Sequence, residues 1–176
     1  MFRTPVLALT VSALCLGSPA RADDAEDKAV MFYGVLHREA PRDEPPPDKP
    51  VTTLDLSRIQ VTDANLRELV VLKDLTVLKL SSTAVTDAGL KNLAALKGLT
   101  SLDLSDTVVT GTGLKDLAAL KSLTTLTLGG EKITDTGIKH LTALKNLKEL
   151  SLAGTKVTAA GLKELQAALP KCKIVQ

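Results

Sequence analysis

The chain repeats itself every 24 residues from Val51 onward, and this repeat constrains its fold more than any other feature. Each copy contains a Leu-x-Leu pair, and no insertion breaks the register. The pairs begin at Leu54, Leu78, Leu102, Leu126 and Leu150. Five copies in one register predict a solenoid, in which a unit buries its apolar side chains only by stacking on its neighbours.

Each unit is expected to contain one strand and one helix. The Leu-x-Leu pair alternates with a period of two, so both leucines point to one face of a short strand. Leu90, Leu93 and Leu96 then recur every three residues, which places them on one stripe of a helix that a lysine-glycine pair ends. Thr86 and Asp87 precede this stripe, where they are expected to cap the free N–H groups of the helix.

The residues of one unit resemble a known family. Leu75-x-x-Leu78-x-Leu80-x-x-Thr83-x-Val85 is similar to the leucine-rich-repeat signature, with Thr where many members have Asn or Cys. The turn that follows is similar to the cysteine-containing subclass and to secreted bacterial repeat proteins. The resemblance covers residues 51–176 and implies an α/β leucine-rich-repeat solenoid, with short parallel strands on the concave face and helices on the convex face. It also implies a protein-interaction scaffold.

Some copies depart from the pattern. Ile59 and Glu131 stand in the slot of Thr83, so a row of polar side chains on that turn is expected to be incomplete. Gly111 and Ala159 replace the capping aspartate, so those two turns are expected to be locally weaker.

The end of the chain is irregular and predicts a cap. Ile174 falls in the slot of Leu150, which indicates a sixth strand after the five repeats of residues 51–176. Cys172 lies beside this strand. We expect a buried thiol there, with an intermolecular disulfide as the alternative.

Residues 1–22 are typical of a secretory signal peptide. Arg3 precedes an apolar run over Val6–Leu16, which is followed by a breaker and the triplet Ala20-Arg21-Ala22. The run is shorter than the roughly 20 residues that a spanning helix needs. We expect cleavage after Ala22, no integral membrane segment in the mature chain, and a secreted, periplasmic or cell-envelope location.

Residues 23–50 have a different composition and predict a linker. They carry eight acids against four cations, and five of the eight prolines fall between Pro41 and Pro50. The segment 29–36 is an apolar island that holds both aromatic residues of the mature chain. It is interpreted as an N-terminal cap over the first repeat, with a docking peptide for a partner and a disordered segment as alternatives.

The outward side of the predicted sheet carries the candidate binding residues. Between the leucines of each pair lies one outward position, and these positions form the central row: Asp55, Lys79, Asp103, Thr127 and Ser151. Adjacent strands are expected to place Lys79 between two carboxylates. The row is interpreted either as a charge ladder that holds the strands in register or as a small polar recognition patch for a protein partner.

The helix side carries a second set of candidate residues. Two slots of the repeat hold cations: Arg67, Lys91, Lys115, Lys139 and Lys163 in one, and Lys73, Lys97, Lys121 and Lys145 in the other. The second slot lies where a cation complements the negative end of a helix. The alternative role for these lysines is binding of an anionic polymer.

Composition excludes several function classes. Loss of Arg3 and Arg21 with the signal leaves 20 cations and 20 acids, and residues 51–176 contain no aromatic side chain, so nucleic-acid binding is not expected. Asp63, Asp87 and Asp135 form a row that Gly111 interrupts, and capping explains each of them, so no metal site is predicted.

Catalysis finds no support in the sequence. The two histidines, His37 and His140, have no nucleophile at a recognisable motif, and His140 is expected to face solvent. We therefore expect an exported, non-catalytic, monomeric scaffold without a cofactor, which binds a protein partner through the concave strand face or the N-terminal extension. The alternative is a structural protein of the cell envelope, or a binder of anionic polymers that uses the convex lysines.

Overall fold

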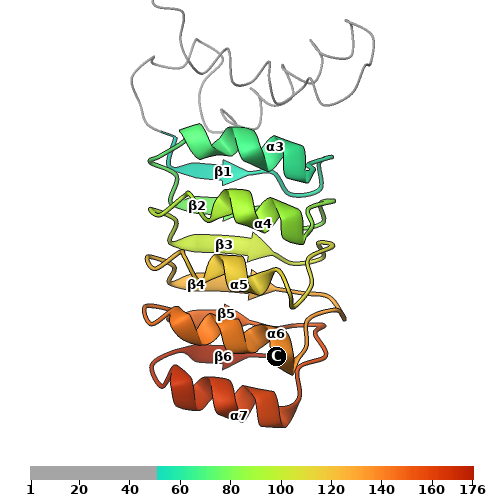
Figure 1. Ribbon diagram of the computed structural model, residues 1–176, viewed down its shortest axis with the longest axis vertical. Helices are drawn as coiled ribbons and strands as arrows, with labels where there is room; N and C mark the ends of the chain where they lie inside the picture. Colours follow the sequence, from blue (N-terminus) through green and yellow to red (C-terminus); the bar gives the residue numbers. More distant parts are fainter. Residues whose placement is uncertain (1–50) are drawn as a thin grey trace, which may run out of the picture.

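The computed structural model describes residues 51–176, which coil into a solenoid. A single sheet lines one side of the solenoid and the helices line the other (Figure 1). The predicted signal peptide, the acidic linker and its apolar segment 29–36 lie outside the described residues.

Six short parallel strands form the sheet, in the order of the sequence. They are β1 (Thr53–Asp55), β2 (Val77–Lys79), β3 (Ser101–Leu104), β4 (Thr125–Leu128), β5 (Glu149–Ser151) and β6 (Lys173–Val175). Each residue pairs with the residue 24 positions later, so Leu54 lies beside Leu78 and Leu150 lies beside Ile174. The aligned leucines and the sixth strand predicted from the repeat are therefore confirmed.

The helical side consists of short helices and 3₁₀ turns. They are α3 (Asp63–Glu68), η1 (Leu69–Val71), α4 (Asp87–Leu93), α5 (Leu114–Leu117), α6 (Asp135–Ile138), η2 (Lys139–Ala143) and α7 (Ala159–Ala168). The α-helices other than α7 are shorter than the leucine stripe predicted. The second copy shows why: α4 ends at Leu93, and the N–H of Leu96 donates to the Leu93 carbonyl at 2.9 Å in a tighter turn that leads toward the next strand.

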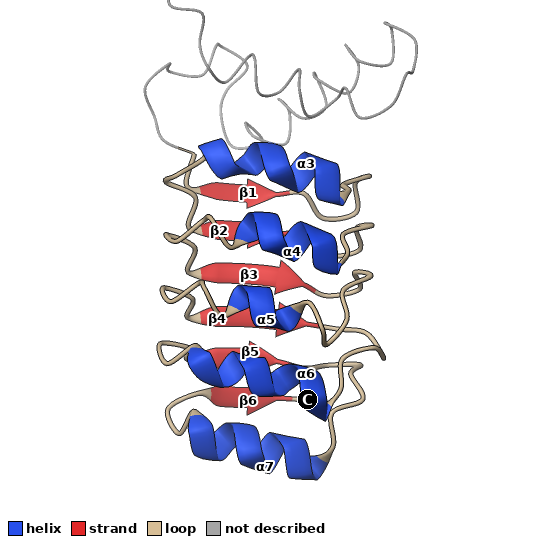
Figure 2. Ribbon diagram, viewed as in Figure 1, coloured by secondary structure: helices blue, strands red, loops and turns tan. Residues whose placement is uncertain are grey.

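The helices are spread more widely along the stack than the strands (Figure 2). A solenoid whose units are spaced differently on its two sides curves toward the side with the closer spacing. The sheet therefore lines the concave side and the helices line the convex side, as the family resemblance implied.

The core is a continuous column of aliphatic side chains between the two sides. Every leucine of the five Leu-x-Leu pairs is at most 1% exposed. Full burial of a leucine contributes roughly 1.5–3 kcal/mol, so the paired leucines alone are a large stabilising contribution. The last copy is capped by the buried side chains of Leu169 and Cys172.

Threonine hydroxyls reinforce the stack in two ways. Before the strands, Thr76, Thr100 and Thr124 each donate to the carbonyl of the threonine 24 residues earlier, at 2.9–3.0 Å. After the strands, Thr83 and Thr107 donate to the carbonyl three residues earlier, both at 2.8 Å. Ile59 and Glu131 cannot do so, and the expected gaps in this second row are present.

Candidate functional site: the concave sheet face

The register of the sheet brings the five residues of the central row together. Asp55, Lys79, Asp103, Thr127 and Ser151 are consecutive partners on β1 to β5. Their side chains alternate with the buried leucines and so point away from the core. Asp55 and Lys79 are exposed, and the other three are half-buried.

The charges in the central row pair unequally. The Lys79 ammonium lies 3.5 Å from Asp55 Oδ2, and it forms no ion pair with Asp103 among the described residues. Asp103 instead turns toward Ser105, whose N–H and hydroxyl both donate to Oδ1, at 2.9 and 2.6 Å. The expectation that adjacent strands place Lys79 between two carboxylates is therefore confirmed by the register, and the ion pair of Lys79 is with Asp55.

The surroundings of Asp55 favour its charged form. Partial burial raises its pKa, but hydrogen bonds from Ser57 and the positive charge of Lys79 outweigh burial and hold the pKa below its usual value. The Asp55–Lys79 pair is exposed, and a pair of this kind contributes about 0–1 kcal/mol. The pair therefore adds little to the stability of the sheet. Asp55 remains ionised, and the charge of Lys79 balances its own.

Several polar atoms of the face have no partner among residues 51–176. Asp103 Oδ2 accepts no hydrogen bond there, and the hydroxyls of Thr127 and Ser151 neither donate nor accept one. The face offers one oriented carboxylate oxygen beside two hydroxyls. Sequence patterning identified these residues but did not indicate which of them would remain available.

The face differs in charge from the rest of the solenoid. The outward positions of the six strands hold three carboxylates, Asp55, Asp103 and Glu149, and two ammonium groups, Lys79 and Lys173. Residues 51–176 contain 16 cations and 12 acids, so the remaining 14 cations and 9 acids lie elsewhere. The concave face is weakly negative on a domain that is positive overall.

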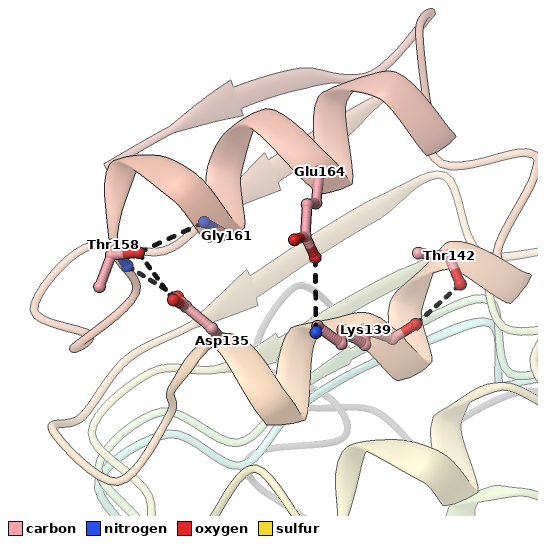
Figure 3. Close-up of polar contacts among 6 residues, drawn as sticks. All are labelled: Asp135, Lys139, Thr142, Thr158, Gly161 and Glu164. Atoms are coloured by element: carbon pink, nitrogen blue, oxygen red, sulfur yellow. Dashed lines mark hydrogen bonds and ion pairs between the residues drawn. The ribbon is translucent and has the colours of Figure 1, made fainter.

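The convex lysines are exposed, and several of them tie neighbouring repeats together. The ammonium groups of Lys97, Lys121 and Lys145 donate to carbonyls at the end of the next helical segment, at 3.1–3.4 Å. Lys139 forms an ion pair of 3.5 Å with Glu164 of the next repeat (Figure 3). The second lysine slot thus complements helix ends as expected, and the helix end belongs to the following repeat.

The aspartates predicted to cap helices have a different role. Asp63, Asp87 and Asp135 each accept the N–H and the hydroxyl of the threonine 23 residues later, at 2.6–2.8 Å. We call each of these Asp–Thr pairs an inter-repeat clamp; Figure 3 shows the one between Asp135 and Thr158. Each aspartate does lie in the first turn of its helix, as predicted, but its carboxylate accepts the hydrogen bonds of the next repeat.

The threonine of the clamp caps the helix instead. Thr86 Oγ1 accepts from the N–H of Ala88 at 3.2 Å, and Thr158 Oγ1 accepts from the N–H of Gly161 at 3.3 Å (Figure 3). One threonine side chain therefore donates to the preceding repeat and accepts from its own helix. This double use accounts for threonine at positions 86 and 158, and the same slot holds threonine in all five copies.

The clamps also explain the glycine of the repeat. A Cβ at Gly89 would lie 2.5 Å from Asp63 Oδ1, and a Cβ at Gly113 would lie 2.9 Å from the Cβ of Asp87. A Cβ at Gly161 would meet the Asp135 carboxylate in the same way. The carboxylate of one repeat thus occupies the space that a side chain in the next repeat would need.

The junction between the third and fourth repeats has no clamp. Gly111 stands in the aspartate slot, and a Cβ at Gly137 would collide with the Cα of Gly111. The Gly111 N–H donates to the Lys132 carbonyl at 3.2 Å, so backbone contact replaces the missing carboxylate. Thr134 of this junction shares a hydrogen bond with Thr136 instead.

The clamps lower the pKa values of two aspartates. Partial burial raises the pKa of Asp87, but hydrogen bonds from Thr110, Thr112 and Gly113 outweigh it and hold the value below its usual range. The side chain and backbone of Thr158 lower the pKa of Asp135. Both carboxylates are therefore held as anions for structural reasons.

The described histidine, cysteine and acidic side chains do not cluster. Among residues 51–176 no group of three or more His, Cys, Asp or Glu side chains could hold a metal ion. His140 is exposed, as expected, and Cys172 is buried, with its thiol pKa raised by that burial and by Glu149. No described helix has the length and apolar content needed to cross a membrane.

Comparison with known proteins agrees with this architecture. A leucine-rich-repeat family profile matches residues 71–94, 99–118 and 143–165. Together with the repeat and the solenoid, this match supports a leucine-rich-repeat protein. No curated protein sequence is significantly similar to it.

Solved structures of the same fold include proteins of different kinds. Actin-binding site 2 of leiomodin-1 has a TM-score of 0.54 at 22% identity, over 70% of this chain and 82% of that chain. A leucine-rich-repeat protein of Leptospira interrogans has a TM-score of 0.52 at 24% identity, over 72% of this chain and 37% of that one. An internalin of Listeria monocytogenes has a TM-score of 0.50 at 16% identity, over 82% and 54% respectively.

Proposed function

We propose that this protein is an exported, non-catalytic scaffold that binds a protein partner through the concave sheet face. The observation that carries the proposal is the difference between the two kinds of polar residue in the repeat. Asp87, Thr110 and Lys97 and their equivalents hold repeats together, whereas Asp103 Oδ2 and the Thr127 hydroxyl have no partner among residues 51–176.

Similarity of fold supports this proposal at the level of the scaffold. One solved structure of the same fold is an actin-binding site of leiomodin-1. That similarity supports the use of such a solenoid as a protein-binding surface, and it does not define the partner of this chain.

Export is proposed from the sequence of residues 1–22. The short positive start, the apolar run and the Ala20-Arg21-Ala22 triplet together are typical of a cleaved signal. The acidic segment 23–50, with its apolar island 29–36, is proposed as a second contact for the partner or as a cap for the first repeat. N-terminal sequencing of the secreted material tests the cleavage: a chain that begins with Met1 or Phe2 would contradict cleavage after Ala22.

The convex lysines define the competing proposal, in which an anionic polymer is the ligand. Their engagement with helix-end carbonyls and with Glu164 favours a structural role for Lys97, Lys121, Lys145 and Lys139. Lys91, Lys115 and Lys163 form no ion pair among the described residues, so they remain the residues through which that proposal can be tested.

The experiment compares two sets of substitutions. The charge-reversed pair Lys79→Glu and Asp103→Lys alters the concave face, and the set Lys91→Gln, Lys115→Gln and Lys163→Gln neutralises the convex face. Each tagged protein is used to capture partners from the cell envelope of the producing organism, and retention of the captured protein is quantified. Loss of the partner with the concave pair alone supports the proposal, and loss with the convex set alone would overturn it.

A further inference from the structure

We propose that the concave face takes a basic side chain, lysine or arginine, of the protein partner, and that this side chain pairs with Asp103. This inference rests on the proposed function and specifies the chemistry of the partner at that face. It commits to one occupant, a cationic segment of another protein.

The first support is the orientation of the Asp103 carboxylate. Two donors from Ser105 fix Oδ1, at 2.9 and 2.6 Å, and so hold the carboxylate plane. Oδ2 accepts no hydrogen bond from residues 51–176. A carboxylate that is already oriented loses little conformational entropy when it binds a guanidinium or ammonium group, which favours binding.

The second support is that the neighbouring cation is already committed. Lys79 is adjacent to both aspartates in the sheet register, but its ammonium lies beside Asp55. The negative charge of Asp55 is balanced by this ion pair, whereas Asp103 forms no ion pair among residues 51–176. On the other side of Asp103 the neighbour in the row is Thr127, an uncharged hydroxyl that can accept a hydrogen bond from a bound cation.

The third support is burial. Asp103 is half-buried, whereas Asp55 and Lys79 are exposed. A charge pair that is partly shielded from water is worth more than an exposed one, because screening is weaker there. The face as a whole holds three carboxylates against two ammonium groups, so its charge complements a cationic partner.

The test uses random peptides displayed on phage, which are selected against the immobilised full-length protein. Enriched peptides are synthesised, and their affinities are measured for wild type, Asp103→Asn and Asp106→Asn. Asp106 is the matched control. It is an exposed aspartate in the turn after β3, and its carboxylate accepts no hydrogen bond from residues 51–176. Its backbone is left-handed (φ 53°), a conformation that asparagine also adopts readily.

The expected result is enrichment of peptides that contain lysine or arginine. Asp103→Asn is expected to weaken their binding about tenfold, whereas Asp106→Asn changes it by less than about twofold. Glutamine in place of the basic peptide residue should weaken binding to wild type equally and add nothing on Asp103→Asn. The Ser105 amide is expected to shift in ¹H–¹⁵N spectra of the complex, because it donates to Asp103.

Two contrary results are distinguishable. If the peptides bind the sheet face, as judged by shifts of the Thr125 and Thr127 amides, but lack a basic residue or ignore Asp103→Asn, the inference is overturned and the proposed function stands. If the peptides bind only the helix side, or if no peptide binds, both are overturned. Urea unfolding of Asp103→Asn checks that the substitution leaves the fold intact.

Discussion

The carboxylate of Asp87 fills the space that a side chain at position 113 would occupy, and Thr110 and Thr112 hold it there through hydrogen bonds of 2.6–2.7 Å. Residues of two successive repeats thus depend on one another across a single junction. The same relationship recurs from Asp63 to Gly89 and from Asp135 to Gly161. Stability of this solenoid therefore depends on polar contacts between repeats as well as on its leucine core.

Replacement of Asp87 by alanine is expected to lower the free energy of unfolding by about 2 kcal/mol. The substitution removes the acceptor for the Thr110 N–H, the Thr110 hydroxyl and the Thr112 hydroxyl. Urea unfolding followed by circular dichroism measures the change. Asp74→Ala is the control, because Asp74 is exposed and has no hydrogen bond among the described residues; an equal loss in both variants would contradict a specific role for the clamp.

Acidification is expected to weaken the clamps. The pKa values of Asp87 and Asp135 are lower in the folded protein than in the unfolded chain, so their contribution is fully present above the unfolded pKa of about 3.9. It is lost as the pH falls through the lower folded values. Urea titrations from about pH 6 to pH 2 should show wild type losing more stability than Asp87→Ala/Asp135→Ala, and parallel curves would count against the assignment.

Replacement of Gly113 by alanine is expected to destabilise the protein by more than about 1 kcal/mol. The new Cβ would lie 2.9 Å from the Cβ of Asp87, which is held in place by two threonines. Gly98→Ala is the control, since its nearest neighbour is the Lys73 carbonyl at 3.5 Å. In the double variant Asp87→Ala/Gly113→Ala, the cost of the new methyl group should fall, and strict additivity of the two effects would argue against the shared space.

Replacement of Asp116 by asparagine is expected to stabilise the protein by about 1 kcal/mol. Asp116 Oδ2 is buried and has no hydrogen-bond partner among residues 51–176. In the equivalent slot one repeat earlier, the Asn92 amide donates to the Asp63 carbonyl at 3.2 Å, so an amide at 116 should find the Asp87 carbonyl. Thermal unfolding tests this prediction. Glu164 occupies the same slot two repeats later and pairs with Lys139, so Glu164→Gln is expected to give no gain in stability.

Cys172 is expected to react slowly with thiol reagents in the folded protein. Its side chain is 4% exposed, and burial together with the nearby Glu149 raises the thiol pKa, which disfavours the reactive thiolate. Modification should become fast only in urea. A disulfide-linked dimer on non-reducing electrophoresis of the native protein would favour the alternative of an intermolecular bridge.

The sheet could be predicted from the sequence because the repeat period is unbroken. A slot of the repeat that carries the same residue type in every copy has to occupy the same place in every turn. This reasoning placed Leu150 beside Ile174 although the last copy is irregular, and the register confirms it. It also placed the five residues of the central row on one face.

The role of the aspartates could not be predicted in the same way. Capping rules consider neighbours within one turn of a helix, whereas Asp87 finds Thr110 only after the chain has coiled once. One signal was present in the sequence. Every copy with a repeat before it has glycine at the slot of Gly113, and the first copy has Asn65, where no aspartate precedes it at the repeat spacing.

The ion-pair partner of Lys79 could not be predicted from the sequence either. The period places it beside both Asp55 and Asp103, and the choice between them depends on side-chain hydrogen bonds. The Ser105 N–H and hydroxyl both donate to Asp103, at 2.9 and 2.6 Å, and the Lys79 ammonium lies 3.5 Å from Asp55. A pattern of residue types does not contain that information.

The contact between Gly111 and Gly137 marks the junction of the solenoid that lacks an inter-repeat clamp. Clamps join the first three repeats to one another and the last two to each other, whereas main chain meets main chain at the equivalent turn between the third and fourth repeats. The threonine and lysine contacts of Thr124 and Lys121 still cross this junction, so it has fewer side-chain bonds than its neighbours rather than none. If the molecule is pulled from its ends, we expect the third and fourth repeats to separate from each other first, before the repeats on either side of that junction unfold.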